Sequence, residues 1–273
     1  MSDQTSTAAS FNPGGIGAGA ADFLKAWKRW PDWLMLGWYD FSIKHRRTLI
    51  GPFWETLQVG IWVGALVLIF GAMRGGQDYY PVYVAAGVTV WNFISSNLTR
   101  ATAVFSKNSN FILNVDNPLM FYVLRQVAYN VFRMAFQLPV YIVCALWFQP
   151  PFGLVTLMAI PGLIAVILTG VFIAPLMGLI GARYRDFGQA MSTVTRFLFF
   201  TTPIFWSPGN NAIKTAAAAY NPFSYFIAVV REPLMGNMPS LLAWVVVLTC
   251  ALASLLVTLW LFGRYQRNIV FWL

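Results

Sequence analysis

The sequence predicts an all-α, polytopic membrane protein with six transmembrane helices. Of its 273 residues, 58% are hydrophobic and only 10% are charged, whereas soluble domains carry roughly 25% charged residues. So much apolar surface cannot be hidden in one water-soluble core. The chain also contains six apolar runs close to the roughly 20 residues that a spanning helix requires. The predicted spans are 56–73, 81–98, 127–148, 154–180, 190–206 and 240–262.

The N-terminal segment 1–20 is rich in Ser, Thr, Ala and Gly and has no apolar run. This composition predicts a disordered tail. The segment also lacks the basic start and apolar middle of a signal peptide, so the first span is expected to act as its own insertion signal.

Residues 21–55 are predicted to form an amphipathic interface region before the transmembrane permease domain, 56–273. In "DFLKAWKRW", the side chains of Phe23, Trp27 and Trp30 fall on one helical face and the basic residues lie elsewhere. Such a helix lies flat among lipid headgroups. Pro31 is expected to end or kink it. The alternative is an ordinary juxtamembrane anchor with no further role.

Two connections are too apolar to be solvated loops. The segment 99–120 contains Phe105, Phe111, Ile112 and Leu113, which predicts a short helix packed on another protein or on the membrane. The segment 207–239 is too short and too rich in Pro to span. It predicts helices that dip into the outer face of the membrane and return, a re-entrant hairpin before the last span.

The distribution of Lys and Arg predicts the orientation, because these residues accumulate in cytoplasmic loops. With a cytoplasmic N-terminus, 13 basic residues lie on the cytoplasmic side and three on the outer side. The cytoplasmic residues are Lys25, Lys28, Arg29, Lys44, Arg46, Arg47, Arg100, Lys107, Arg125, Arg183, Arg185, Arg264 and Arg267. The outer residues are Arg74, Lys214 and Arg231. Both termini are therefore predicted to be cytoplasmic.

The same asymmetry accounts for the net charge of +9, which needs no nucleic-acid partner and suits anionic membrane lipids. None of the nine acidic residues and not the single His falls inside a predicted span, which argues against proton coupling. The sequence has no catalytic motif, no metal-spaced cluster and no phosphate-binding P-loop. Cys144 and Cys250 lie in apolar runs and predict neither a disulfide framework nor a zinc site. If ATP drives this protein, another chain must bind it.

Aromatic residues make up 17% of the chain and concentrate in "WNF" (91–93), "FLFFTTPIFW" (197–206) and "YNPFSYF" (220–226). About half would suffice for the interfacial aromatic belts. The remainder are candidates to stack on sugar rings along a path for a polyhydroxylated chain. The candidate path residues are Trp91, Phe200, Phe205, Trp206 and Tyr225, together with the arginines Arg133 and Arg196.

Arg133 and Arg196 lie within predicted spans, where an arginine costs roughly 2.5–3.5 kcal/mol on insertion scales. We expect no carboxylate at their depth. They would then snorkel toward the cytoplasm, cap carbonyl groups, or meet an anionic lipid phosphate.

The stretch "GARYRDFGQA", 181–190, separates two apolar runs. Asp186 followed by Gln189 predicts an N-cap with its reciprocal residue. Arg183 could pair with Asp186 three positions on, and Tyr184 could anchor in the headgroups. With Arg185, these residues predict a charged cytoplasmic elbow between the fourth and fifth spans.

Four motifs give the chain a resemblance to a known family. They are "RRTLIGPFW" before the first span, "RYRD" in the elbow, "TPIFWSP" at the end of the fifth span and "NPFSYFIAVVREPLMG" before the last. Their order resembles that of type-2 ABC exporter permeases, and most closely the branch that exports lipid-linked polysaccharides such as O-antigen, capsule and teichoic acid. The resemblance covers about residues 22–273.

The resemblance implies a homodimer in the inner membrane that binds two copies of a separate ATP-binding subunit. ATP and Mg²⁺ would bind that subunit, with no cofactor in this chain. It further implies a coupling helix within 99–118, a re-entrant outer gate at about 207–236, and a polymer path between the protomers. The implied coupling residues are Lys107, Asn110, Phe111, Ile112 and Asp116.

Two alternatives stay open at this point. The same architecture could export another substrate, such as a drug or a lipid. A membrane-embedded transferase acting on a lipid-linked sugar would instead need a base near the membrane face, for which only Asp40, His45 and Asp186 are candidates.

Overall fold

The computed structural model describes residues 15–71, 79–209 and 211–273, and these ranges contain helices and no strand. The all-α prediction is confirmed for them. The α-helices are α1 (Ile16–Lys28), α2 (Trp30–His45), α3 (Trp54–Gly71), α4 (Tyr80–Arg100), α5 (Val104–Lys107), α6 (Ser109–Asn114), α7 (Leu119–Phe148), α8 (Ala159–Arg183), α9 (Phe187–Thr201), α10 (Ala212–Tyr220), α11 (Pro222–Leu234) and α12 (Leu241–Trp272). Short 3-10 turns cover Gly51–Phe53, Ala101–Ala103 and Leu154–Met158.

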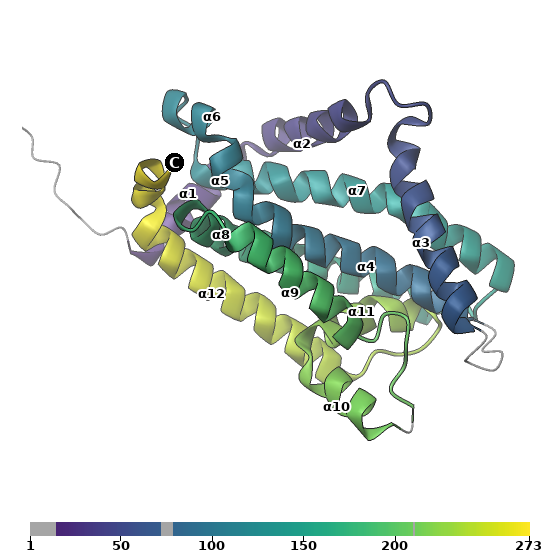
Figure 1. The fold of residues 1–273 in the computed structure, drawn as a ribbon. Coiled ribbons are helices and arrows are strands. Elements are labelled where there is room, and N and C mark those ends of the chain that lie inside the picture. The colour runs from purple at the N-terminus through teal and green to yellow at the C-terminus, as the bar shows by residue number, and fades with distance from the viewer. Residues whose placement is uncertain (1–14, 72–78, 210) are drawn as a thin grey trace, which may run out of the picture.

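The long helices lie side by side in one bundle, with α10 and α11 at one end and α5, α6 and the C-terminus at the other (Figure 1). Helix α4 is the central member and packs against α3, α7, α8, α9 and α11. Its sequence suits this place because small and β-branched residues fill most of its length. Valine, alanine and glycine let neighbouring helices approach closely.

Four segments of the described chain are helices long and apolar enough to cross a membrane. They are Gly51–Gly71, Leu119–Phe148, Leu154–Arg183 and Leu241–Gln266. These segments contain or overlap the predicted spans 56–73, 127–148, 154–180 and 240–262.

The other two predicted spans, 81–98 and 190–206, correspond to helices α4 and α9, which do not meet that criterion. Helix α4 carries Asn92, Ser96 and Asn97 among its apolar residues, which lowers its hydropathy. Helix α9 has only 15 residues, because the helix stops at Thr201. The prediction of six crossings therefore stays a prediction.

The N-terminal helix begins inside the segment that was predicted to be disordered. Helix α1 starts at Ile16, while residues 1–14 lie outside the described residues. The chain turns at Arg29 and continues as α2, with Pro31 in the first turn of the new helix. The predicted break at Pro31 is confirmed, since proline is tolerated at this position and not farther into a helix.

Both surface helices are held on the bundle, α1 against α12 and α7, and α2 along α7. The Asp22 carboxylate accepts the backbone N–H of Met120 at 2.8 Å and that of Leu119 at 3.3 Å. It thus caps the start of α7 from another helix, where free N–H groups attract a negative charge. Burial raises the pKa of the Asp22 carboxyl above its ordinary value.

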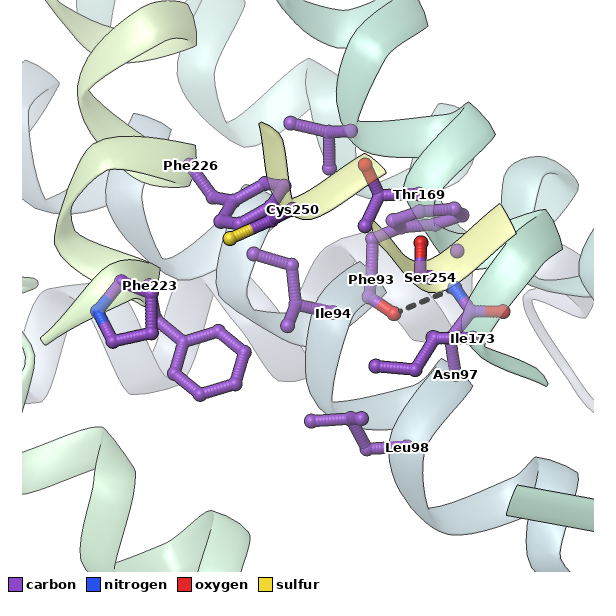
Figure 2. Close-up of a pocket in the computed structure, with 13 residues that line it drawn as sticks. Phe93, Ile94, Asn97, Leu98, Thr169, Ile173, Phe223, Phe226, Cys250 and Ser254 are labelled. Atoms are coloured by element: carbon purple, nitrogen blue, oxygen red, sulfur yellow. Dashed lines mark hydrogen bonds between the residues drawn. The ribbon is translucent and has the colours of Figure 1, made fainter. Parts of the chain in front are cut away.

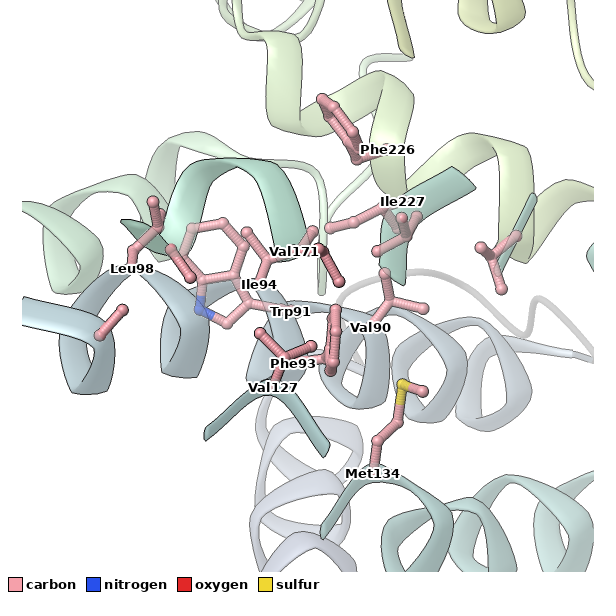
Figure 3. Packing of buried hydrophobic residues seen from close by; sticks show 14 of the residues in the cluster. Val90, Trp91, Phe93, Ile94, Leu98, Val127, Met134, Val171, Phe226 and Ile227 are labelled. Atoms are coloured by element: carbon pink, nitrogen blue, oxygen red, sulfur yellow. The ribbon is translucent and has the colours of Figure 1, made fainter. Parts of the chain in front are cut away.

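The hydrophobic core lies where α4 meets α7, α8 and α11 (Figure 3). Val90, Phe93 and Ile94 of α4 are buried among side chains from all three neighbours. Those neighbouring side chains include Val127, Met134, Val171, Phe226 and Ile227. Helix α11 is thereby part of the core.

Two glycines of α8 permit backbone contacts that any larger residue would prevent. A Cβ atom on Gly162 would lie 2.3 Å from the carbonyl oxygen of Val229, and one on Gly181 would lie 1.9 Å from that of Thr102. Small residues at such crossings let helices approach closely in membranes. Gly162 therefore seats α11 on α8, and Gly181 seats the 3-10 turn that follows α4.

Candidate substrate groove and coupling surface

Helix α9 ends in a stretch of non-helical backbone, Thr202–Trp206, in which the carbonyl groups of Pro203, Phe205 and Trp206 accept hydrogen bonds from side chains of other helices. The Tyr80 hydroxyl donates to the Phe205 carbonyl at 2.7 Å, and the Tyr83 hydroxyl donates to the Trp206 carbonyl at 2.9 Å. Arg231 Nη1 donates to the Pro203 carbonyl at 2.6 Å. Non-helical backbone at membrane depth is tolerated where protein satisfies it in this way.

The end of α9 is also connected to the start of α11 by a hydrogen bond at the break. Asn221, at the start of α11, donates from its side-chain amide to the Thr202 hydroxyl at 2.8 Å. Its side-chain oxygen accepts the backbone N–H of Phe223 and so caps α11. The described part of the segment 207–239 thus contains the consecutive helices α10 and α11, of which α11 packs on α4, α8 and α12.

A groove of about 360 Å³ runs between α3, α4 and α9. Its lining includes Trp62, Trp91, Asn92, Ser95, Arg196 and Phe200. A second hollow of about 490 Å³ lies toward the α10 end and shares Phe200 with the first. The two adjoining hollows are therefore lined by aromatic rings, by the uncharged polar side chains of Asn92, Ser95, Thr195 and Thr201, and by the basic side chains of Arg196 and Lys214.

Five of the seven predicted path residues line these two hollows, at different depths. Phe200 is 64% exposed and borders both hollows. Trp91 is buried at the base of the first hollow, with its ring 5.8 Å from that of Phe223. Phe205 and Trp206 line the second hollow. Arg196 is exposed in the first, and its Nε donates to the Ser192 carbonyl of its own helix at 3.3 Å.

Tyr225 and Arg133 line neither hollow. The Tyr225 hydroxyl donates to the Ala219 carbonyl at 2.9 Å, which joins α11 to α10. Arg133 belongs to a separate ionic cluster inside the bundle. Both side chains are thus hydrogen-bonded to other residues of the chain, Tyr225 to Ala219 and Arg133 to Glu55.

That cluster corrects the expectation that no carboxylate shares the depth of Arg133. Glu55 lies in the first turn of α3 and is 1% exposed. Its Oε2 accepts from Arg133 Nε at 2.7 Å, and its Oε1 from Lys44 Nζ at 2.7 Å. His45 Nε2 lies 3.6 Å from the same Oε1. The sequence reading placed Glu55 just outside the first span, but α3 begins at Trp54 and carries it inward.

The cluster reaches the groove through uncharged side chains. Arg133 Nη1 donates to Ser96 Oγ at 2.7 Å. Gln137 Nε2 donates to Glu55 Oε2 at 3.3 Å, and Gln137 Oε1 accepts from Asn92 at 3.2 Å. Because Asn92 lines the groove, hydrogen bonds connect the end of α2 with the groove wall. The sequence feature that could have indicated this cluster is Glu55, a single acidic residue at the edge of an apolar run.

The segment 99–118 is anchored at its start and exposed at its end. Phe105 of α5 is fully buried, and its ring lies 6.2 Å from that of Phe262 on α12. Helix α6 has no fully buried residue, and it stands out from the bundle in Figure 1. Phe111 is 56% exposed. Lys107, Asn110 and Asp116 are also exposed, whereas Ile112 is half-buried.

The turn between α8 and α9 differs from the predicted elbow in its contacts. Asp186 is the N-cap residue of α9, but its side chain makes no capping hydrogen bond. Its φ and ψ of −83° and −11° are helical, whereas side-chain capping needs extended backbone at this position. No Arg183–Asp186 ion pair forms between these two described residues. The Arg183 guanidinium lies over the rings of Tyr184, at 5.5 Å, and Trp272, at 5.4 Å. Tyr184 and Arg185 are exposed.

The bundle of apolar helices, the satisfied break in α9 and the groove beside it define a multi-pass membrane protein of the transporter class. Residues 32–235, from α2 to the end of α11, match the family of ABC-2 type transporters, and the chain belongs to this family. It is the transmembrane component of an ABC transporter, a transport subunit that acts with an ATP-binding subunit. A comparison with curated proteins finds no match.

Proposed function

We propose that this chain is the permease that exports a lipid-linked polysaccharide across the cytoplasmic membrane. The observation that carries the proposal is the open groove in which exposed Phe200 lies beside Arg196. Aromatic faces suit the apolar faces of sugar rings, and an arginine suits a phosphate of the lipid carrier. The two chemistries therefore match the two parts of such a substrate.

The groove supports a homodimer as the working unit. It lies on the surface of a single chain and is walled by α3, α4 and α9. A second copy placed against this side would turn two open grooves into one enclosed path. Symmetric homodimers are the commonest protein assemblies, and two permease copies would bind two ATP-binding subunits.

The orientation follows from the charge distribution. We propose six crossings with both termini cytoplasmic, with the fifth crossing formed by α9 and the non-helical residues after it. Lys107 and Arg185 then lie at the cytoplasmic end with α6, and Lys214 lies at the outer end with α10. Helix α6 is placed to contact the ATP-binding subunit, and α10–α11 forms the outer gate.

The transferase alternative has less support from the candidate bases. Asp40 accepts two hydrogen bonds from Arg125 at 2.6 Å, and His45 is buried beside Glu55. Neither is free to accept a proton from a substrate. Asp186 is exposed, but a single carboxylate in a turn does not make a transferase site. Export of a drug or another lipid on the same architecture is the second candidate, because an aromatic groove also suits apolar substrates.

The test is co-purification with the ATP-binding subunit, followed by mass spectrometry of the bound lipid. A saccharide linked to a lipid carrier supports the proposal, and a bound drug-like molecule or simple lipid favours the second candidate. Cysteine substitutions test the orientation. Those at positions 107, 185 and 267 should react only from the cytoplasmic side, and one at position 214 only from outside. Labelling of position 185 from outside would contradict it.

A further inference from the structure

A further cavity, distinct from the groove and from the second hollow, lies between α4, α8, α11 and α12 (Figure 2). Its volume is about 170 Å³, and its wall is almost entirely apolar. Phe93 and Ile94 of α4 lie at the wall together with Phe226 of α11 and Cys250 of α12. No residue of this cavity lines the groove or belongs to the Glu55 cluster, although the ring of Phe223 in its wall lies 5.8 Å from that of Trp91 at the base of the groove.

The few polar side chains in the wall are already engaged inside the protein. The Thr169 hydroxyl donates to the Ala165 carbonyl at 2.8 Å, and the Ser254 hydroxyl donates to the Ala251 carbonyl at 2.9 Å. Asn97 donates to the Phe93 carbonyl at 2.9 Å, the contact drawn as a dashed line in Figure 2. Asn97 Oδ1 also accepts from Asn130 at 2.9 Å. A water molecule needs two to four polar partners, so this wall offers water little.

The size of the cavity suits a hydrocarbon. An apolar protein cavity of about 150 Å³ stays dry and binds benzene or xenon, and this one is slightly larger. It is also partly open to the surface of the chain. A linear molecule can therefore enter with one end and leave the rest outside.

The helices that form the cavity indicate which hydrocarbon can reach it. Two walls come from α8 and α12, whose segments are long and apolar enough to cross a membrane. Both helices also expose large apolar side chains, among them Leu168, Leu252 and Leu256. Such surface in a spanning helix faces the acyl chains of the bilayer. An acyl chain can pass from that surface into the cavity without meeting water.

We propose that this cavity is a binding site for one acyl chain of a membrane lipid. Pro222, Phe223 and Phe226 form its α11 wall. A bound chain would therefore fill the space between α11 and the spans and hold α10 and α11 in their present position. The site is independent of the transported substrate, because it depends only on the chain lying in a bilayer.

The test uses the full chain in lipid nanodiscs that contain phosphatidylcholine with a photoactivatable diazirine on its acyl chain. After irradiation, mass spectrometry locates the adducts. We expect adducts on Phe93 and Ile94, which lie inside the bundle. Exposed Leu252 provides the internal standard for contact with bulk lipid. Labelling of Leu252 without labelling of Phe93 or Ile94 would overturn the proposal.

Two variants that fill the cavity, Ser254→Leu and Cys250→Phe, should lower the Phe93 and Ile94 adducts several-fold relative to the Leu252 adduct. Two filling variants are used so that misfolding of one, seen as aggregation in gel filtration, still leaves a result. Thr169→Val conserves volume and should keep the adducts, because the Thr169 hydroxyl has no role in binding hydrocarbon. Adducts that persist in both filling variants would also overturn the proposal.

Discussion

The guanidinium of Arg231 lies over the ring of Tyr83, with its central carbon 3.8 Å from the ring centroid. Both side chains reach the carbonyl oxygen of Pro203, and the Tyr83 hydroxyl shares its one hydrogen between this carbonyl and that of Trp206. Arg231 is 4% exposed, and a buried charge is costly unless it is compensated. The cation–π contact, the Pro203 carbonyl and the Glu232 carboxylate, 4.0 Å from Arg231 Nη2, compensate the charge, while Arg231 Nε has no hydrogen-bond partner among the described residues. The same pair replaces helical hydrogen bonds that the backbone lost where α9 ends.

The first prediction is that Arg231→Lys destabilises the protein. A lysine has no planar fork, so it cannot lie over the Tyr83 ring and also reach the Pro203 carbonyl as the arginine does. We expect a loss of about 1–3 kcal/mol in the free energy of unfolding, the range for a buried group left unsatisfied. Denaturant unfolding of the purified chain measures it. Lys214→Ala, at an exposed position of α10, is the matched control and should change little. Equal stability of the Arg231 and Lys214 variants would contradict the role given to the pair.

The break after α9 illustrates what the sequence could and could not predict. The apolar runs predicted the positions of the long helices, because spanning helices need continuous apolar segments. The predicted fifth span ran through Pro203 to residue 206, whereas α9 ends at Thr201, just before this proline, which cannot donate a backbone hydrogen bond. The partners of the freed carbonyl groups come from α4 and α11, which are far away along the chain. Only the packing of the helices brings Tyr80, Tyr83 and Arg231 to them.

The second prediction concerns Glu55 and Arg133. Removing one partner of a buried ion pair costs about 3–5 kcal/mol, because the other charge is left uncompensated. Glu55→Gln should destabilise the chain by roughly this amount, and Arg133→Gln by less, because Lys44 still contacts the Glu55 carboxylate. The double variant should lose much less than the sum, since it leaves neither charge alone. Unfolding free energies of the four proteins form the measurement.

Lys44 provides the control for this cycle. It contacts the other oxygen of Glu55, but its side chain is 44% exposed. Exposed ion pairs contribute about 0–1 kcal/mol, so Lys44→Gln should have a small effect. Additive losses in the Glu55–Arg133 double variant would show that the two side chains do not stabilise each other.

The sequence predicted which residue types line the candidate site, but not how deeply each residue is buried. Aromatic residues indicated a path, and of the seven candidates Trp91, Arg196 and Phe200 line the groove while Phe205 and Trp206 line the second hollow. Composition could not tell that Trp91 lies at the base of the groove while Phe200 is exposed, because depth depends on the packing of α3 and α9 around α4. The ionic partner of Arg133 was missed because α3, the helix of the first predicted span, begins at Trp54, slightly earlier than its apolar run.

The third prediction compares substitutions at the buried start of the 99–118 segment, Phe105, and at its exposed end, Phe111. Phe111→Glu should leave stability nearly unchanged, because the side chain is exposed and surface changes usually stay within about 0.5 kcal/mol. It should weaken binding of the ATP-binding subunit and export, since a charge replaces the apolar contact. Phe105→Ala, at the buried anchor, should instead cost about 3–5 kcal/mol of stability. Pull-down of the ATP-binding subunit and thermal unfolding distinguish the two effects. Normal binding and export by Phe111→Glu would exclude α6 as the coupling helix.

The last prediction tests the groove with two phenylalanines of the same helix. Phe200 is 64% exposed and Phe197 is 68% exposed, but only Phe200 lines the hollows. Alanine at either position removes a ring from the surface of α9, so both variants should fold and assemble alike. If the groove holds sugar, Phe200→Ala should reduce export, because an aromatic contact contributes about 0.5–1.5 kcal/mol beyond its buried area. That corresponds to a loss of roughly two-fold to twelve-fold at 25 °C. Phe197→Ala should export normally. The measurement is surface polymer divided by the amount of assembled complex, which removes any effect of abundance. If both variants export equally well, the chain is still an ABC transporter subunit, but its path does not run along this face of α9.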